Sequence, residues 1–329
     1  MFELAELEKA AELVHAIMPP TPQYAWPLLA ARTGCEVWVK HENHTPTGAF
    51  KMRGGLVYLD GYKRRQPRGP GLISATRGNH GQSLAFAGRR LGVPLTLVVP
   101  HGNSREKNAA MRAFGAELVE VGRDFDMARE AAERMAVERG LEYAPSFHPD
   151  LVKGVATYAL EFFRGAPDLD TVYVPIGMGS GIVGMIRTRD LLGLKARIVG
   201  VVSTQAPAFA LSFKAGKVVT TPTADTFADG VACRVPPVDG VRIVCAGADR
   251  IVSVGEEEAA EAIRAYFTDT HNIAEGAGAV GLAALMQESA RMRGKRVGVV
   301  LSGGNIDMPI LTGILGGGSV QQARLTAAG

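Results

Sequence analysis

Short apolar segments alternate with helical patterns along the chain, and this alternation restricts the fold more than any other feature of the sequence. Several segments are apolar at consecutive positions, as strands buried on both faces of a parallel sheet are. Several helical stretches between them end on glycine, which suits a C-terminal cap. Repeated strand–helix units predict an α/β protein with mostly parallel sheets. The predicted strands are EVWVKHE (36–42), GLISAT (71–76), LTLVVP (95–100), ELVEVG (117–122), TVYVPIG (171–177), RIVGVVS (197–203) and RVGVVLSG (296–303).

The length of the chain and the spacing of these units predict two domains. The chain has 329 residues, 47% of them hydrophobic, which is enough for a substantial core. Residues 71 to about 148 hold a compact run of strand–helix units. The segments on either side of this run read as one larger unit. We therefore expect a large domain made of residues 1–54 and 151–329 and a small domain made of residues 55–150.

Charge, cysteine content and hydropathy exclude several classes of protein. With 36 Lys and Arg against 33 Asp and Glu, the net charge of +3 is too small to suggest nucleic-acid binding. Three separated cysteines without a CxxC pair indicate a reducing compartment. No apolar run approaches the roughly 20 residues of a membrane span, and the N-terminal segment lacks the pattern of a signal peptide. We expect a cytoplasmic protein without nucleic-acid or membrane partners.

Three glycine-rich turns follow predicted strands: TRGNHGQS (76–83), GMGSGIVG (177–184) and SGGNID (302–307). Ligands of parallel α/β proteins bind at the carboxyl ends of strands, so these turns are expected to meet at one crevice. In the middle turn, Gly177, Gly179 and Gly181 would let the backbone and the next helix start approach an anion. A tight turn without any ligand is the alternative. Neither a P-loop nor a dinucleotide fingerprint fits, because the Lys-Ser/Thr pair and the acidic strand end are missing.

The segment HTPTGAFKMRGG (44–55) places Lys51 on a turn bounded by glycines. Taken alone, Lys51 could be a surface cation, a phosphate-binding lysine or a nucleophile in a pocket. A phosphate cradle, an isolated lysine, an Asn-His turn and a serine at a strand end together favour a pyridoxal phosphate site. A lysine that forms a Schiff base needs a partly desolvated pocket, so that its amine can be neutral.

These motifs resemble those of the fold type II pyridoxal-phosphate enzymes, in particular the threonine/serine dehydratases and serine racemase. KHENHTPTGAFKMRGG (40–55) is similar to the family pattern K-x-E-N-x-x-x-T-G-S-F-K-x-R-G, and SATRGNHGQ (74–82) to S-x-G-N-H-x-Q. VPIGMGSGIVG (174–184) resembles the tetraglycine phosphate loop, and LSGGNID (301–307) the C-terminal serine motif. The resemblance implies a tryptophan synthase β-like fold, in which two domains each have a central, mostly parallel sheet flanked by helices. It also implies a homodimer.

The resemblance implies a role for each matching residue. Lys51 would bind the cofactor covalently and then remove the α-proton of the substrate. The other cofactor-binding residues would be Phe50 against the ring, Asn79 at its 3′-oxygen, Gly230 and Glu275 beside it, Ser302 at the pyridine nitrogen, and Gly177, Met178, Gly179, Ser180 and Gly181 around the phosphate. The substrate-binding residues would be Thr76, Arg77, Gly78, Asn79 and His80. For Glu275, a carboxylate that merely stabilises a helix N-terminus is the competing account.

Ser302 narrows the predicted reaction. A neutral hydroxyl cannot keep the pyridine nitrogen protonated as an aspartate would, which disfavours transamination and suits loss of a β-substituent. We therefore predict a dehydratase that converts a 3-hydroxy-L-amino acid, such as threonine or serine, to a 2-oxo acid and ammonia. The alternatives are a racemase, a dehydratase of phenylserine, hydroxyaspartate or a hydroxylated diamino acid, and a pyridoxal-phosphate-binding protein without turnover.

Two departures from the family pattern carry further expectations. Arg77 stands where serine racemase has a serine that acts as an acid and threonine dehydratases commonly have alanine. An arginine is a poor proton donor, which counts against racemisation. Arg77 could bind the substrate carboxylate or a polar β-substituent, or point to solvent or a domain–domain ion pair. Val202 and Ala208 replace the acidic ligands of the family's divalent-cation site, so no metal is expected.

Overall fold

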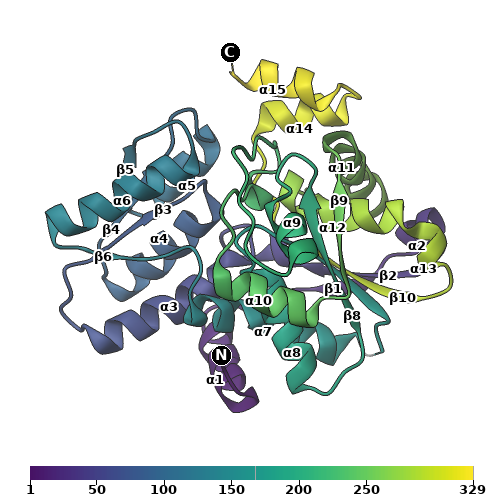
Figure 1. Ribbon diagram of the computed structural model, residues 1–329, viewed down its shortest axis with the longest axis horizontal. Coiled ribbons are helices and arrows are strands. Elements are labelled where there is room, and N and C mark those ends of the chain that lie inside the picture. The colour runs from purple at the N-terminus through teal and green to yellow at the C-terminus, as the bar shows by residue number, and fades with distance from the viewer. Residues whose placement is uncertain (167, 329) are drawn as a thin grey trace.

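The structure, a computed structural model, describes residues 1–166 and 168–328. Two sheets, each flanked by helices, lie next to each other (Figure 1). The four-stranded sheet forms the left part of the view and the six-stranded sheet the right part. Residues 167 and 329, which belong to the predicted large domain, lie outside the described residues.

The larger sheet has the strand order β1–β2–β10–β7–β8–β9. Strand β1 runs antiparallel to β2, and the other neighbouring strands are parallel. Its faces pack in two apolar clusters, one against α2, α11, α12, α14 and α15 and the other mainly against α7, α8 and α10. The strands are β1 (Gln23–Ala25), β2 (Glu36–His41), β7 (Thr171–Pro175), β8 (Arg197–Ser203), β9 (Arg250–Val254) and β10 (Arg296–Leu301). The helices around this sheet are α2 (Pro27–Thr33), α7 (Pro149–Gly165), α8 (Ser180–Leu191), α9 (Ala208–Ala215), α10 (Val238–Gly247), α11 (Glu256–Thr270), α12 (Gly276–Gln287), α13 (Ser289–Met292), α14 (Met308–Leu315) and α15 (Val320–Ala328).

The smaller sheet is parallel throughout, with the order β5–β4–β3–β6. Alanines of α6 pack closely on one face, while α3, α4 and α5 cover the other. Helix α1 contributes apolar side chains to the cores of both sheets. The elements are β3 (Leu72–Ala75), β4 (Leu95–Val99), β5 (Glu117–Glu120), β6 (Glu142–Tyr143), α1 (Leu4–His15), α3 (Lys51–Arg65), α4 (Asn79–Leu91), α5 (Arg105–Ala113) and α6 (Phe125–Arg139).

The predicted α/β class with two mostly parallel sheets is confirmed. All seven predicted strands are present, and six of them end one or two residues earlier than expected, where the chain turns towards the next helix. Strands β1, β6 and β9 were not predicted. The first two have only three and two residues, too few to show a period, and β9 is an edge strand with polar residues. Helices α4 and α6 end at glycine caps, as predicted.

The two sheets draw on different parts of the chain. Strands of the smaller sheet lie within residues 72–143, and strands of the larger sheet lie before and after them. The expected domain boundaries fall inside α3 and in the first turn of α7, so both helices connect the two units. The boundaries themselves stay a prediction. Among the described residues, no helix is both long enough and apolar enough to span a membrane.

Candidate active site

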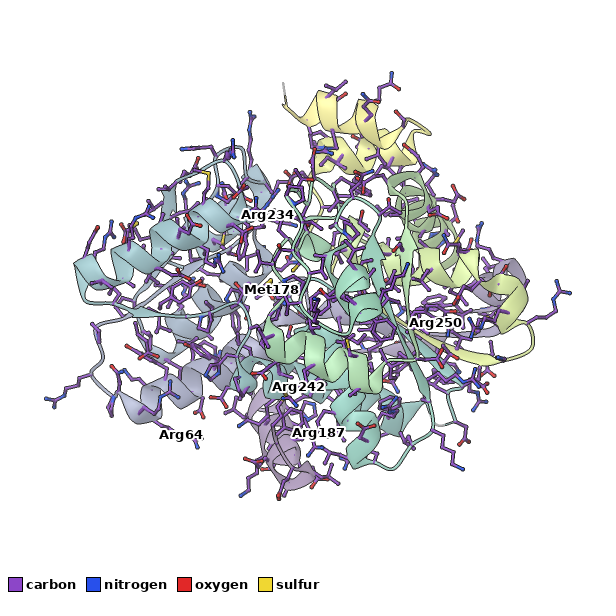
Figure 2. All side chains as sticks on the ribbon, in the orientation of Figure 1. Arg64, Met178, Arg187, Arg234, Arg242 and Arg250 are labelled. Atoms are coloured by element: carbon purple, nitrogen blue, oxygen red, sulfur yellow. The ribbon has the colours of Figure 1, made fainter. Side chains whose placement is uncertain are left out.

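One cavity lies where the carboxyl ends of β3, β7 and β10 approach each other. The three glycine turns therefore meet, as the sequence predicted. In Figure 2 the labelled Met178 of this cavity lies where the two sheet units adjoin. The structure brings every predicted site residue to the cavity wall: Phe50, Lys51, Thr76, Arg77, Gly78, Asn79, His80, Gly177, Met178, Gly179, Ser180, Gly181, Gly230, Glu275 and Ser302.

Lys51 is the first residue of α3, and the end of β10 fixes its position. The N–H of Phe50 donates to the carbonyl oxygen of Ser302 at 3.0 Å. The Lys51 amine lies 4.8 Å from the centre of the Phe50 ring and donates to the Ser180 hydroxyl at 3.1 Å. Burial lowers the pKa of Lys51 to about 8, so roughly a tenth of the amine is neutral at pH 7, far more than for an exposed lysine. A partly buried amine without a carboxylate partner among the described residues is suited to act as a nucleophile in a pocket, and its position at the cavity contradicts the surface-cation alternative.

The middle glycine turn joins β7 to the N-terminus of α8. The first N–H groups of a helix have no partner inside it, so those of α8 are open to an anion at the cavity. Gly177 allows the loop that contains Gly230 to lie against this turn, because a Cβ atom on Gly177 would be 2.2 Å from the Gly230 carbonyl oxygen. Two segments singled out in the sequence thus form one wall.

A buried hydrogen-bond network links the two sheet units beside this wall. Asn79 donates to Oε1 of Glu275 at 2.6 Å and accepts from Asn305 at 2.9 Å. The Lys107 amine donates to Oε2 of Glu275 at 3.0 Å and to Oδ2 of Asp229 at 2.7 Å. Glu275 precedes α12, but its side chain does not cap that helix. The Glu275 carboxylate therefore bonds to side chains of this network and not to the backbone of α12.

Two ionisable groups of this network have shifted pKa values. Burial, with the charge of Asp229, raises the pKa of Glu275 above its usual range, although Lys107 and Asn79 act in the opposite direction. Burial alone would lower the pKa of Lys107, but Asp229 and Glu275 outweigh it and raise the value. Lys107 is consequently a fixed cation, whereas Glu275 is able to take up a proton.

The remaining predicted residues with polar side chains differ in whether those side chains have hydrogen-bond partners. The Ser302 hydroxyl is buried and donates to the Ala277 carbonyl oxygen at 3.3 Å. Burial, with a smaller effect of Lys51, lowers the pKa of His80 to about 3, so this imidazole is neutral. Within the described residues, Arg77 has no hydrogen bond or ion pair, and its Nε is buried without a partner. The alternative of a domain–domain ion pair at Arg77 is wrong.

Several cavity residues were not predicted. Asp229 precedes Gly230 and Ala232 lies two residues after it. Their closeness in sequence to a predicted site residue could have identified them. Lys107 lies in the charged segment REKNAAMRA, which looks like a solvated helix face. His44, at the start of the segment that contains Lys51, bonds Asn272 at 2.7 Å and does not line the cavity. The unpredicted lining residues are Lys107, Phe125, Ser146, Pro175, Asp229, Ala232 and Ala277.

The donor set of the cavity fits pyridoxal phosphate. A buried lysine without a carboxylate partner can bind an aldehyde, and an open helix N-terminus with glycines can hold a phosphate. Phe50 supplies an apolar surface, and the hydroxyl of Ser302 is a neutral partner for a ring nitrogen. Three or more His, Cys, Asp or Glu side chains do not come together as a metal site anywhere in the described residues.

Comparison with known proteins identifies the family. The family model described as pyridoxal-phosphate dependent enzyme matches residues 16–303, so the chain belongs to this family. It is 39% identical over 295 residues to the L-threonine ammonia-lyase of Geobacter sulfurreducens, covering 89% of this chain and 73% of that protein. It is 31% identical over 310 residues to the L-threo-3-hydroxyaspartate ammonia-lyase of a Pseudomonas species, covering 94% and 97%.

A solved structure supports the same assignment. The processed form of threonine deaminase isoform 2 from Solanum lycopersicum matches with a TM-score of 0.85 and 29% identity, covering 95% of this chain and 93% of that one. The predicted family, fold class and pyridoxal phosphate cofactor are confirmed. The relatives named above are lyases, in agreement with the predicted enzyme class.

Proposed function

We propose that this chain is a pyridoxal-phosphate-dependent ammonia-lyase that dehydrates a 3-hydroxy-L-amino acid to a 2-oxo acid and ammonia. Threonine and serine are the default substrates. The observation that carries the proposal is the buried Lys51 amine, whose pKa is lowered to about 8 and which faces the glycine turn before α8. The ammonia-lyases among the relatives support the same reaction.

The residues of the cavity have separable tasks in holding the cofactor. Residues 177–181 and the N-terminus of α8 would hold the phosphate, Asn79 the 3′-oxygen and Ser302 the ring nitrogen, with Phe50 against the ring and Gly230 and Glu275 beside it. When bound, the cofactor withdraws electrons from the α-carbon of the substrate and thereby acidifies its α-proton. The Lys51 amine accepts that proton, and the Ser180 hydroxyl keeps the amine in position.

The N-terminus of α4 is suited to bind the α-carboxylate of the substrate. The Thr76 hydroxyl accepts the N–H groups of Gly78 and Gly81 at 3.0 and 2.9 Å. The N–H groups of Asn79 and His80 have no partner inside the helix and are left for a ligand. A carboxylate held there would fix the α-carbon relative to Lys51.

Racemisation is disfavoured because it needs a second proton donor on the face opposite Lys51. Arg77 does not give up its proton at working pH. His80 is neutral, with a pKa lowered to about 3, and is a poor acid. A larger or more polar 3-hydroxy amino acid is the second candidate, because the unpaired Arg77 lines the cavity and one relative is named L-threo-3-hydroxyaspartate ammonia-lyase.

We also propose that the enzyme works as a cytoplasmic homodimer with a large domain of residues 1–54 and 151–329 and a small domain of residues 55–150. The dimer is supported by the family resemblance, and a reducing compartment by the three free cysteines. Sedimentation analysis would test the dimer, since a single species with the mass of one chain would contradict it.

The decisive experiment measures 2-oxo acid release by purified, cofactor-loaded protein. The substrates are L- and D-serine, L-threonine, its allo isomer, phenylserine and 3-hydroxyaspartate. We expect release from at least one L-substrate and none from the Lys51→Ala variant. Lys217→Ala, which changes an exposed lysine, is the matched control and should behave as wild type. Release by Lys51→Ala at the wild-type rate would contradict the proposal.

A further inference from the structure

Arg77 lies at the junction of two cavities. The catalytic cavity adjoins an outer cavity formed by residues 123–126, the segment 222–226 and Arg234, and three residues line both of them: Arg77, Phe125 and Ala232. A molecule bound at Lys51 and extending towards the outer cavity would therefore pass Arg77. The position of Arg77 favours a role in recognising one end of the substrate.

Three arginines and three aspartates line the outer cavity, but their charges are unevenly paired. Arg234, labelled in Figure 2 where the two sheet units meet, pairs with Asp126 at 2.7 Å and with Asp124 at 3.5 Å. Asp225 pairs with Arg324 at 2.6 Å. Each carboxylate of the outer cavity thus has a cationic partner. Arg77 and Arg123 have no such partner in the part of the chain that the structure describes. The two guanidinium groups without a carboxylate partner, rather than the net charge of the cavity, favour an anionic ligand.

The guanidinium of Arg77 is only partly exposed to water, and its Nε is buried without a hydrogen-bond acceptor. Buried polar groups nearly always have a partner, and an exception calls for a ligand or another explanation. The planar guanidinium fork matches a carboxylate, which can accept two parallel hydrogen bonds from it. A carboxylate of the substrate would satisfy this donor.

The proposed site of the α-carboxylate is the N-terminus of α4, whose first N–H groups, those of Asn79 and His80, have no partner inside the helix. Arg77 is thereby free for a different group. We infer that Arg77 binds a carboxylate on the side chain of the substrate, and that the lyase selects 3-hydroxy amino acids with a second carboxylate, the class of 3-hydroxyaspartate. This inference rests on the proposed lyase function.

The test compares two substrates that differ in charge and hardly in shape. L-threo-3-hydroxyaspartate has a side-chain carboxylate, and L-threo-3-hydroxyasparagine has a neutral amide in its place. We expect wild-type kcat/KM to favour hydroxyaspartate by about 100-fold, because the amide leaves the guanidinium charge unpaired. Arg77→Met, which removes the charge and keeps the bulk, should abolish this preference, because it should lower kcat/KM far more for hydroxyaspartate than for hydroxyasparagine or threonine.

Two further variants separate recognition from general electrostatics. Arg77→Lys keeps the charge without the fork and should retain only part of the preference. Arg123→Met removes the other unpaired cation, at the wall of the outer cavity, and is the matched control. We expect Arg123→Met to preserve the preference within about threefold and mainly to weaken the salt dependence of kcat/KM.

Two kinetic results would overturn the inference and leave the lyase intact. One is an equal loss of kcat/KM by Arg77→Met on threonine, hydroxyasparagine and hydroxyaspartate, which would assign Arg77 to the α-carboxylate. The other is a wild-type enzyme that does not distinguish hydroxyaspartate from hydroxyasparagine.

A binding measurement tests the role of Arg77 even if no substrate releases a 2-oxo acid. The absence of release would contradict the proposed lyase function and not the anion site at Arg77. Calorimetry on the cofactor-loaded protein compares succinate with its monoamide, succinamate. Tighter binding of succinate by wild type, lost in Arg77→Met and kept in Arg123→Met, supports the anion site at Arg77. Equal affinities for succinate and succinamate in wild type contradict it.

Discussion

Two buried clusters of cationic side chains and carboxylates differ in their balance of charge. The Arg53 cluster consists of Lys40, Glu42, Arg53 and Glu161, so two permanent cations face two carboxylates, and the His15 imidazole also bonds Glu161 at 2.8 Å. The Lys107 cluster consists of Lys107, Asp229 and Glu275, where one cation faces two carboxylates. In the Arg53 cluster, Nε, Nη1 and Nη2 of Arg53 all donate hydrogen bonds, with Thr157 and Thr21 as additional acceptors. The Lys107 cluster lies at the catalytic cavity.

The charge balance explains why the carboxylates of the two clusters shift in opposite directions. Burial alone would raise the pKa of Glu161, but Arg53 and Lys40 outweigh it and lower the pKa to about 2. For Glu275, burial and Asp229 together outweigh Lys107, and the pKa is raised. The balanced cluster anchors α3 two residues after Lys51. The unbalanced cluster keeps a carboxylate at the reaction site that can change its protonation state, an imbalance of the kind expected at functional sites.

The largest effect should come from breaking the balanced cluster. Arg53→Met leaves Glu42 and Glu161 buried without their main cation, and we expect the free energy of unfolding to fall by about 3–5 kcal/mol. Urea unfolding at pH 7 measures this loss. Arg64→Met, on the same helix but with an exposed side chain paired to Asp60, is the control and should cause no measurable change. A loss for Arg53→Met as small as that of the control would show that the cluster does not anchor α3.

The corresponding substitution in the unbalanced cluster should cost less. Lys107→Met leaves Asp229 beside Glu275, but Glu275 can relieve the repulsion by taking up a proton. We therefore expect a loss of about 1–3 kcal/mol at pH 7. The difference in the free energy of unfolding between Lys107→Met and wild type should become smaller when the pH is lowered to 5. A proton on Glu275 then takes the place of the missing positive charge. A loss equal to that of Arg53→Met, unchanged by pH, would remove the distinction between the clusters.

The part of the site that is formed by backbone turns was predictable from the sequence. The turns at Gly177, Asn79 and Ser302 follow strands, and parallel topology brings the carboxyl ends of strands together. The fold was predictable for the same reason, since buried parallel strands are nearly continuous apolar runs. Edge strands such as β9 lack this pattern.

Side-chain partnerships were not predictable, because they join residues that are remote in the chain. Lys107 is 122 residues from Asp229 and 168 residues from Glu275. Nothing within its own helix distinguishes it from the exposed charges nearby. The unpaired state of Arg77 is likewise a property of packing, since the sequence left open whether Arg77 binds a substrate, a solvent molecule or a carboxylate of the other domain.

The contributions of Glu161 and Glu275 to the free energy of unfolding should change with pH in opposite directions. The folded pKa of Glu161 lies below its unfolded value of about 4.3, so its stabilising effect is present above pH 4.3 and lost as the pH falls towards 2. The folded pKa of Glu275 lies above its unfolded value, so its contribution is lost as the pH rises through the folded pKa.

Urea unfolding of Glu161→Gln and Glu275→Gln between pH 3 and pH 8 tests these signs. The destabilisation by Glu161→Gln should grow as the pH rises, and that by Glu275→Gln should shrink. Each slope is at most about 1.4 kcal/mol per pH unit, the value for a single proton. Slopes of the same sign in both variants would contradict the assigned charge balance.

The smallest effect is expected at the rim of the outer cavity, where Asp126 of α6 pairs with Arg234 of the other sheet unit. Water reaches about a third of the Arg234 side chain, so the pair is screened and Asp126→Asn should cost at most about 1 kcal/mol. Asp225→Asn, whose pair with Arg324 is largely exposed, is the control and should cost nothing measurable. If Asp126→Asn instead destabilised the protein as much as Lys107→Met, contact between the sheet units would depend on the rim as much as on the buried cluster. The hydrogen bonds of Glu275 to Asn79 and Lys107 would then contribute no more to the contact between the two sheet units than the surface pair does.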